Sequence, residues 1–261
     1  LSAKDEPDIF NAIKHGALVE NVVFDENNKI DFTDSTKTEN TRVSYPIHYI
    51  PNSLSCQGQE SKSSHPNNII FLTCDAYGVL PPISKLTLEQ TMYHFISGYT
   101  AKVAGTERGV KEPTATFSPC FGGPFLTLHP LRYAELLKEK IERYESKVYL
   151  VNTGWSGGHA LSGKPRISID DTRKMISSIL NGTIDNSTLQ RDPYFGLMYP
   201  KELLGVDSSK LDPKLAWANL EEYHNQANSL TQMFIDNFKN YGNRVKHLVD
   251  AGPKLVKKET I

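Results

Sequence analysis

The sequence is short of cysteine, of long apolar runs and of net charge. Its three cysteines, Cys56, Cys74 and Cys120, are an odd number without the spacing of metal ligands. Such cysteines favour free thiols in a reducing compartment, so we expect a cytoplasmic protein. No apolar run approaches the roughly 20 residues that cross a bilayer, which argues against a membrane partner. The 29 basic and 30 acidic side chains form no basic face, which argues against nucleic acid.

What the sequence does contain is enough apolar material for a buried core. Of its 261 residues, 38% are hydrophobic and 23% are charged, values that are ordinary for a globular protein. This length accommodates one large domain or two small ones.

One stretch predicts a strand, a glycine-rich loop and a helix in succession. Val148–Val151 is a short apolar run of strand-forming residues. Glycines then break any regular pattern between 154 and 163. Ser168 can cap a helix, because Asp171 follows in the capping-box position and apolar residues continue at helical spacing.

The glycine-rich loop is a near miss to a phosphate-binding motif. Gly158–Lys164 satisfies the first seven positions of a P-loop, but Pro165 stands in the eighth. A P-loop needs Ser or Thr there, for a hydroxyl on magnesium and a backbone N–H on phosphate, and proline supplies neither. We therefore interpret the segment as a surface loop and not as a P-loop.

Other elements are predicted by periodicity and turn residues. Ile69–Cys74 is apolar throughout, as expected for a central strand covered on both faces. Asp75–Pro82 leaves its carboxyl end, where open α/β sheets bind ligands. The remaining expectations are a helical turn over 8–15, a hairpin of 20–24 with 30–33, a polar loop over 57–68, helices over 87–98, 130–144 and from 217 onward, a long loop or lid over 105–119, irregular chain over 192–206 and a frayed tail over 254–261.

Three sets of reactive side chains have both a chemical and a structural interpretation. Arg42, taken alone, is favoured as a solvated surface charge. Cys120 could be a nucleophile, but the sequence places no base beside it, so a buried inert thiol is favoured. Asp170 and Asp171 could bind a metal, but the helix dipole also favours carboxylates in a first helical turn, and that interpretation is preferred.

A set of short motifs occurs in the same order in one known family. The motifs are Glu6–Ile13, Glu39–Pro46, Asp75–Pro82, Tyr93–Thr100, Ala104–Gly109, Leu150–Trp155, Arg166–Ile169 with Asp171–Arg173, Phe234–Phe238 and Ala251–Leu255. Together they resemble the ATP-dependent phosphoenolpyruvate carboxykinases, most closely the yeast and fungal forms. The resemblance runs from end to end of the chain and covers about the C-terminal half of a full-length member.

The resemblance implies the fold and the domain. It implies an α/β protein with a mixed sheet and flanking helices, as part of the carboxykinase C-terminal nucleotide-binding domain. Residues 1–261 are then expected to form the nucleotide-binding and lid portion. The family's own P-loop and its Lys, His and Asp ligands for manganese correspond to positions upstream of Leu1. ATP and Mn²⁺ or Mg²⁺ are the implied cofactors, with no metal ligand expected in these residues.

The resemblance also implies roles for individual residues. Arg42 resembles the family arginine that touches both nucleotide phosphate and substrate, and is the candidate catalytic residue. Glu6 resembles a residue near the ribose. Arg166 and Ile167 resemble contacts on the adenine side, with Thr172 as a hydrogen-bonding neighbour, so that the glycine loop shapes a base pocket. The segment 99–117 resembles a lid whose closure excludes water from the enolate.

The function implied is the conversion of oxaloacetate and ATP to phosphoenolpyruvate, CO₂ and ADP in gluconeogenesis. The alternative is an isolated nucleotide-binding or interaction module, catalytically inactive because the metal and phosphate cradle are missing. The expected partners are oxaloacetate or phosphoenolpyruvate, a companion N-terminal fragment or full-length chain, and a second copy in a homo-oligomer. Without the missing half, we expect exposed apolar surface and open sheet edges.

Overall fold

A computed structural model describes residues 2–4, 6–34, 36–37, 41–51, 53, 64–102, 110 and 112–257. The chain divides into two compact units, one formed by 1–64 with 103–112 and the other by 65–102 with 113–261. Among the described helices, none combines the length and the apolar composition needed to span a bilayer.

The first unit is small and built from short elements. They are α1 (Pro7–Asn11), β1 (Leu18–Glu20), β2 (Val23–Phe24), β3 (Ile30–Asp31) and β4 (Arg42–Ser44). The predicted hairpin is confirmed for Val23–Phe24 with Ile30–Asp31, because β2 and β3 pair antiparallel, whereas Glu20 belongs to β1, which pairs with β4. Asp25 Oδ1 accepts hydrogen bonds from the backbone N–H groups of Asn27 and Lys29, which closes the turn between β2 and β3. The predicted helical turn is confirmed as α1.

The second unit is organised around a mixed sheet of five strands in the order β10-β11-β6-β9-β5. The strands are β5 (Asn68–Thr73), β6 (Ile83–Lys85), β9 (Lys147–Asn152), β10 (Leu189–Arg191) and β11 (Met198–Pro200). β5 and β9 are parallel, whereas β6 runs antiparallel to β9. The predicted α/β class with a mixed sheet is therefore confirmed.

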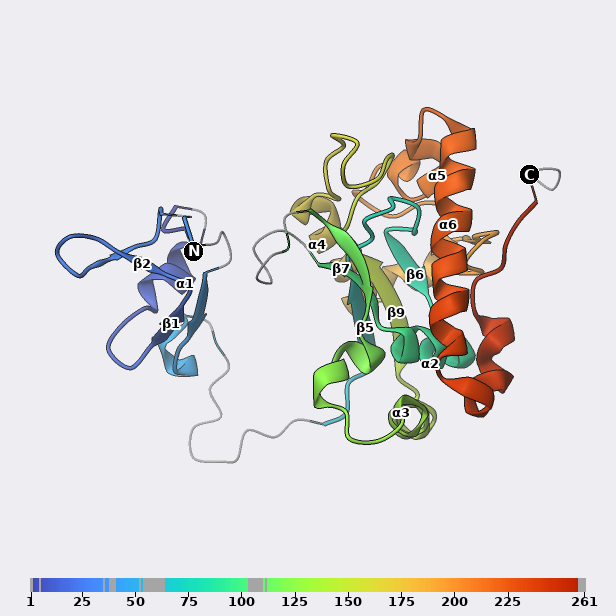
Figure 1. Cartoon of the computed structure of the whole chain (residues 1–261), viewed down its shortest axis with the longest axis horizontal. Coiled ribbons are helices and arrows are strands. Elements are labelled where there is room, and N and C mark those ends of the chain that lie inside the picture. Colours follow the sequence, from blue (N-terminus) through green and yellow to red (C-terminus); the bar gives the residue numbers. More distant parts are fainter. Residues whose placement is uncertain are drawn as a thin grey trace. The chain divides into compact units, whose positions relative to one another are not determined.

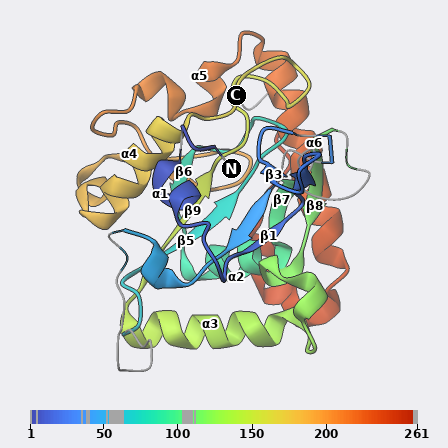
Figure 2. The same ribbon diagram turned by 90° about the vertical axis from the view of Figure 1, so that its left-hand side faces the viewer.

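Helices cover both faces of this sheet (Figures 1 and 2). They are α2 (Leu88–Ser97), α3 (Pro130–Tyr144), α4 (Ile169–Leu180), α5 (Pro213–Ala216) and α6 (Leu220–Lys239). Val148 and Leu150 belong to the core packed against α2, α3 and α6, while Tyr149 and Val151 belong to the core on the α4 side. Alternate residues of β9 thus face opposite layers, as a strand requires. Both views show α3 and α5 at opposite ends of the unit.

The helix boundaries follow the predicted start and stop signals. Thr87 and Gln90 form a capping box at α2, and Gly98 ends that helix in the left-handed conformation. Pro130 occupies the first turn of α3. Ser168 caps α4 by accepting a hydrogen bond from the backbone N–H of Asp171.

The prediction that residues 69–74 form a central strand was wrong. β5 lies at the edge of the sheet within the described residues, and its Leu72 side chain is 57% exposed. Phe71, on the opposite side of the strand, is buried and packs against Phe95. An apolar run shows only that the side chains of a strand are to be buried, and it does not identify the segments that bury them.

Three loop predictions also need correction. Within 105–119, residues Thr114–Phe117 form β8, which pairs antiparallel with β7 (Tyr99–Lys102). Within 192–206, Met198–Pro200 is β11. The tail is anchored through residue 256, because Asn228 exchanges two hydrogen bonds with the backbone of Val256. Residues 57–63 of the predicted polar loop, 103–109 and 111 of the predicted lid, and 258–261 of the tail lie outside the described residues.

Candidate functional site: a cavity beyond the carboxyl ends of β5 and β9

The two parallel strands β5 and β9 end side by side, and one side chain joins the loops that follow them. Asn152 Oδ1 accepts hydrogen bonds from the backbone N–H of Asp75 at 3.0 Å and of Gly154 at 2.8 Å. Its Nδ2 donates to Leu80 O at 3.2 Å. The buried amide of Asn152 therefore holds the loop after β5 against the loop after β9, where α/β sheets bind ligands.

The two loops touch backbone to backbone. A Cβ on Gly154 would lie 2.2 Å from Asp75 N, and a Cβ on Gly78 would lie 2.1 Å from Gly158 O. Both approaches exclude any larger residue. Gly154, in the glycine-rich loop, and Gly78, in the loop after β5, therefore have a packing role in the structure.

Asp75 is fully buried at the centre of this arrangement. Its carboxylate accepts hydrogen bonds from the backbone N–H groups of Tyr77, Val79 and Leu80 and from the Tyr99 hydroxyl. Burial raises the pKa of Asp75, and these donors oppose that shift by stabilising the charged form. The carboxylate fixes the loop after β5.

Arg166 and Ile167, near the end of the loop after β9, lie beside the first residues of that loop. Trp155 and Arg166 form an antiparallel bridge, and Ile167 N donates to Gly154 O at 2.8 Å. Arg166 Nε donates to Thr153 O at 2.9 Å, and its guanidinium carbon lies 5.5 Å from the centre of the Trp155 ring. The guanidinium is thereby held over an aromatic face, in a cation–π contact.

A cavity of about 350 Å³ opens beside this bridge. Its walls are mainly apolar, with a polar side formed by Arg166, Asp171, Lys210 and two serines. The lining residues are Pro82, Ser156, Pro165, Arg166, Ile167, Ser168, Asp171, Met175, Val206, Lys210 and Ala216. This composition suits a flat, mostly apolar ligand with a few polar edge atoms.

The structure brings Arg166 and Ile167 together in this cavity, but Thr172 is not among its lining residues. The Thr172 hydroxyl donates to Ser168 O at 2.9 Å, within the first turn of α4. The neighbouring Asp171 lines the cavity instead. Sequence reasoning assigned Asp171 to the capping box and the helix dipole, and no local pattern pointed to its partner Lys210.

Asp171 is held by contacts from two elements. Its Oδ2 accepts hydrogen bonds from Lys210 Nζ at 2.7 Å and from the Ser168 hydroxyl at 2.8 Å. The hydrogen bond from Lys210 lowers the pKa of Asp171, as do Ser168 and the nearby positive charges, so the carboxylate is ionised at neutral pH.

Glu6 and Arg42 belong to the other unit. The exposed Glu6 immediately precedes α1. Arg42 is exposed on β4, where its Cα pairs with that of Glu20 across the strands. In the part of the chain that the structure describes, no carboxylate forms an ion pair with Arg42.

No group of three or more His, Cys, Asp or Glu side chains that could hold a metal ion occurs among the described residues. Asp170 pairs with Lys174 at 2.6 Å on the exposed side of α4. Cys120 is half-buried where the sequence favoured a buried thiol, and this burial raises the pKa of the thiol to about 11, which keeps it protonated.

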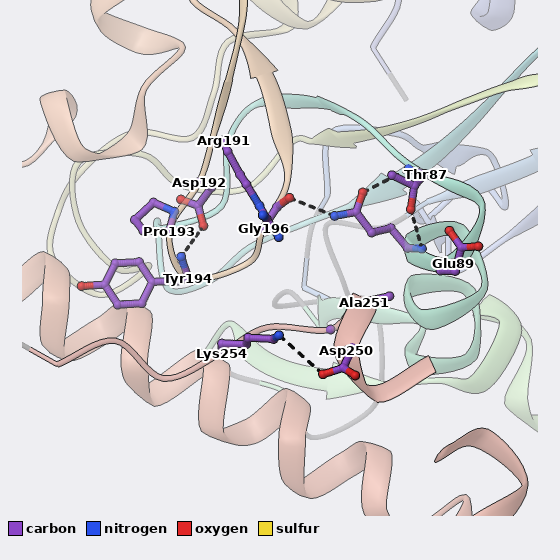
Figure 3. A pocket seen from close by; sticks show the side chains of 12 residues that line it. Thr87, Glu89, Arg191, Asp192, Pro193, Tyr194, Gly196, Asp250, Ala251 and Lys254 are labelled. Atoms are coloured by element: carbon purple, nitrogen blue, oxygen red, sulfur yellow. Dashed lines mark hydrogen bonds and ion pairs between the residues drawn. The ribbon is translucent and has the colours of Figure 1, made fainter. Parts of the chain in front are cut away.

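A second and larger cavity, of about 640 Å³, lies away from the predicted residues (Figure 3). It is bounded by the first turn of α2, by the turn between β10 and β11, and by the segment 250–254. Asp192 lies buried at its wall and accepts a hydrogen bond from Tyr194 N, while Lys254 pairs with Asp250 within the segment 250–254. Burial raises the pKa of Asp192 to about 7. Sequence reasoning gave no sign of this cavity.

Comparison with known proteins gives two results. Residues 1–209 match the family model described as phosphoenolpyruvate carboxykinase. A curated protein named phosphoenolpyruvate carboxykinase (ATP), from Caldanaerobacter subterraneus subsp. tengcongensis, is 52% identical over 255 residues. That alignment covers 97% of this chain and 48% of the relative, so the chain spans about half the length of the protein it matches.

Proposed function

Since the chain belongs to the phosphoenolpyruvate carboxykinase family, we propose that the protein is an ATP-dependent carboxykinase of gluconeogenesis, a carboxy-lyase. Oxaloacetate loses CO₂, and the enolate that remains takes the γ-phosphoryl group of ATP, which gives phosphoenolpyruvate and ADP. The observation that carries this proposal is the 52% identity to a relative named for this enzyme. The cavity lined by Arg166 and Ile167 adds support.

The cavity beside the Trp155–Arg166 bridge is the proposed base pocket. A volume of about 350 Å³ accommodates a purine ring, and its mainly apolar walls favour the faces of such a ring. Arg166 stacks on the base from one side, and Ile167 covers it by an apolar contact. We further propose that Thr172 lies near the base and Glu6 near the ribose.

Arg42 is the proposed phosphate-bridging residue. A forked, permanently charged guanidinium can hydrogen-bond two acceptors at once, here a phosphoryl oxygen and the enolate oxygen. The exposed position of Arg42 and the lack of an ion-pair partner within the described residues leave its donors available for such ligands. We therefore propose that it neutralises charge that develops during phosphoryl transfer.

The described residues do not fit a divalent metal, because they offer no cluster of ligands. We propose that the ligands for Mn²⁺ or Mg²⁺ lie outside these 261 residues, in a part of the protein that corresponds to the half of the relative not spanned by this chain.

A second candidate function is favoured because the chain spans only about half the length of the relative. On its own, a chain with half the relative's length acts as a nucleotide-binding or interaction module without turnover. The exposed Leu72 and the unpaired edge of β5, within the described residues, offer a surface on which a companion segment adds a strand.

One experiment separates the two functions. The 261-residue chain and the full-length protein are each incubated with oxaloacetate, ATP and Mn²⁺, and phosphoenolpyruvate and ADP are measured. We expect stoichiometric products from the full-length protein and none from the isolated chain. Absence of turnover by the full-length protein would contradict the carboxykinase proposal, and turnover by the isolated chain would contradict its assignment as an inactive module.

A further inference from the structure

Asp171 is the only carboxylate among the described residues that line the cavity beside Arg166. Its side chain is 11% exposed, so it is largely removed from water while it borders the opening. The other polar residues of the lining are cationic or hydroxyl-bearing. A lone carboxylate at the edge of a mainly apolar cavity is suited to orient a ligand through one hydrogen bond.

The hydrogen bonds of this carboxylate are unevenly distributed. Oδ2 accepts from both Lys210 Nζ and the Ser168 hydroxyl. Oδ1 accepts no hydrogen bond from any described residue. An ionised carboxylate has about four acceptor positions, so one oxygen remains available to a donor. The contacts to Oδ2 fix the orientation of the group and leave the free oxygen in a defined place.

A purine base presents different groups at its six position. Adenine carries an amino group there, which is a donor, whereas guanine and hypoxanthine carry a carbonyl oxygen, which is an acceptor. A carboxylate oxygen can pair with the amino group, but it repels the carbonyl oxygen. A site built for the donor rejects the other bases strongly, because buried polar groups would be left unpaired.

We propose that Asp171 is a specificity-determining residue, which selects adenine by accepting a hydrogen bond from the 6-amino group of the base. This inference rests on the proposed function, since it requires the nucleotide base to occupy the cavity that Arg166 and Ile167 line. Lys210 and Ser168 act on the base through Asp171, by holding its carboxylate in place. Asp171 thereby supplies the polar recognition and Arg166 and Ile167 the contacts to the faces of the ring.

The test compares ATP with ITP, which differs at the six position by a carbonyl oxygen in place of the amino group. In the full-length protein, kcat and KM are measured for both nucleotides, and equilibrium binding of both is measured without oxaloacetate. We expect Asp171→Asn to lower the ratio of kcat/KM for ATP over ITP at least about tenfold, mainly through KM, because the amide can donate to the carbonyl of ITP.

The chain supplies a matched control in the adjacent carboxylate. Asp170 lies in the same helical turn and carries the same charge, but it pairs with Lys174 and does not line the cavity. Asp170→Asn is expected to leave the ATP to ITP ratio within about twofold of the wild-type value, which is a free-energy difference of about 0.4 kcal/mol. Helix-dipole and net-charge effects are equal in the two variants.

Each outcome decides the proposal. An unchanged ratio in Asp171→Asn, or an equal loss for both nucleotides, overturns it and makes Asp171 a structural residue only. If that variant does not fold, Asp171→Ser replaces it, because serine is tolerated in a first helical turn and removes the carboxylate. Carboxykinase activity with an unaltered ratio rejects this inference alone, whereas failure of the wild-type protein to bind either nucleotide rejects it together with the proposed function.

Discussion

The Tyr99 hydroxyl donates a hydrogen bond of 2.8 Å to the buried carboxylate of Asp75, and this contact joins the first strand of the β7–β8 hairpin to the loop after β5. Both side chains are at most 3% exposed. Burial raises the pKa of Tyr99, so its hydroxyl stays protonated and remains a donor. The pair therefore anchors the start of β7 to the loop after β5. Asn152 holds the same loop through its hydrogen bond from Asp75 N.

We expect Tyr99→Phe to lower the free energy of unfolding by about 1–3 kcal/mol, because it leaves a buried carboxylate with one donor fewer. Denaturant unfolding of the full-length protein gives the value. Tyr144→Phe is the matched control, since Tyr144 is 39% exposed and stacks on His65 through its ring. The same loss of stability in both variants would contradict a special role for the Tyr99 hydroxyl.

Local signals in the sequence predicted most helix boundaries and the class of the fold. Thr87 with Gln90 gave the start of α2, and Ser168 gave the start of α4, because a cap depends on residues only a few positions apart. The edge position of β5 was missed, since strand order depends on which distant segments pair. The same holds for the hydrogen bond between Asp171 and Lys210, whose residues are 39 positions apart in the sequence.

The candidate site was predicted in part, and only through the family resemblance. Arg166 and Ile167 meet in one cavity with Trp155 close by. Local patterns missed this site because it depends on the bridge between Trp155 and Arg166, at the two ends of the loop after β9. A glycine-rich stretch has no periodicity that could indicate such a bridge. The roles of all five residues, Glu6, Arg42, Arg166, Ile167 and Thr172, stay predictions.

Arg42→Lys is expected to reduce kcat by about 100-fold or more with little change in thermal stability, because a lysine ammonium is a point charge and cannot span two acceptors. Steady-state assays of the full-length protein measure the first quantity and thermal unfolding the second. Glu20→Gln serves as the control, because Glu20 lies opposite Arg42 on β1 and reports any disturbance of the strand pair. Unchanged turnover in the lysine variant would remove Arg42 from the reaction.

Arg166→Ala is expected to raise KM for ATP by about 10-fold, with a smaller effect on KM for oxaloacetate, because the guanidinium contributes stacking to the base and not to the acid. The experiment varies each substrate at saturating levels of the other. Arg173→Ala, an exposed change on α4 outside the cavity lining, should leave both values unchanged. A larger effect on oxaloacetate than on ATP would show that the base-pocket assignment is wrong.

Asp192 should make the protein less stable as pH rises from about 4 to about 7. Burial raises the pKa of Asp192 to about 7 in the folded protein, whereas an unfolded Asp titrates near 3.9. Between these values the folded state binds a proton that the unfolded state has lost, so stability falls with rising pH and levels off above about 7. The slope from this one group is at most about 1.4 kcal/mol per pH unit.

The Asp192→Asn variant isolates this effect from the other titrating groups. Asparagine keeps an oxygen that can accept the hydrogen bonds from Tyr194 N and Phe195 N, but it does not ionise. The free energy of unfolding is measured for both proteins between about pH 4.5 and pH 8, and the difference is plotted against pH. We expect the variant to gain stability relative to wild type as pH rises through this window. A difference that stays constant with pH would mean that Asp192 keeps an ordinary pKa, and that its burial is offset by the two backbone donors.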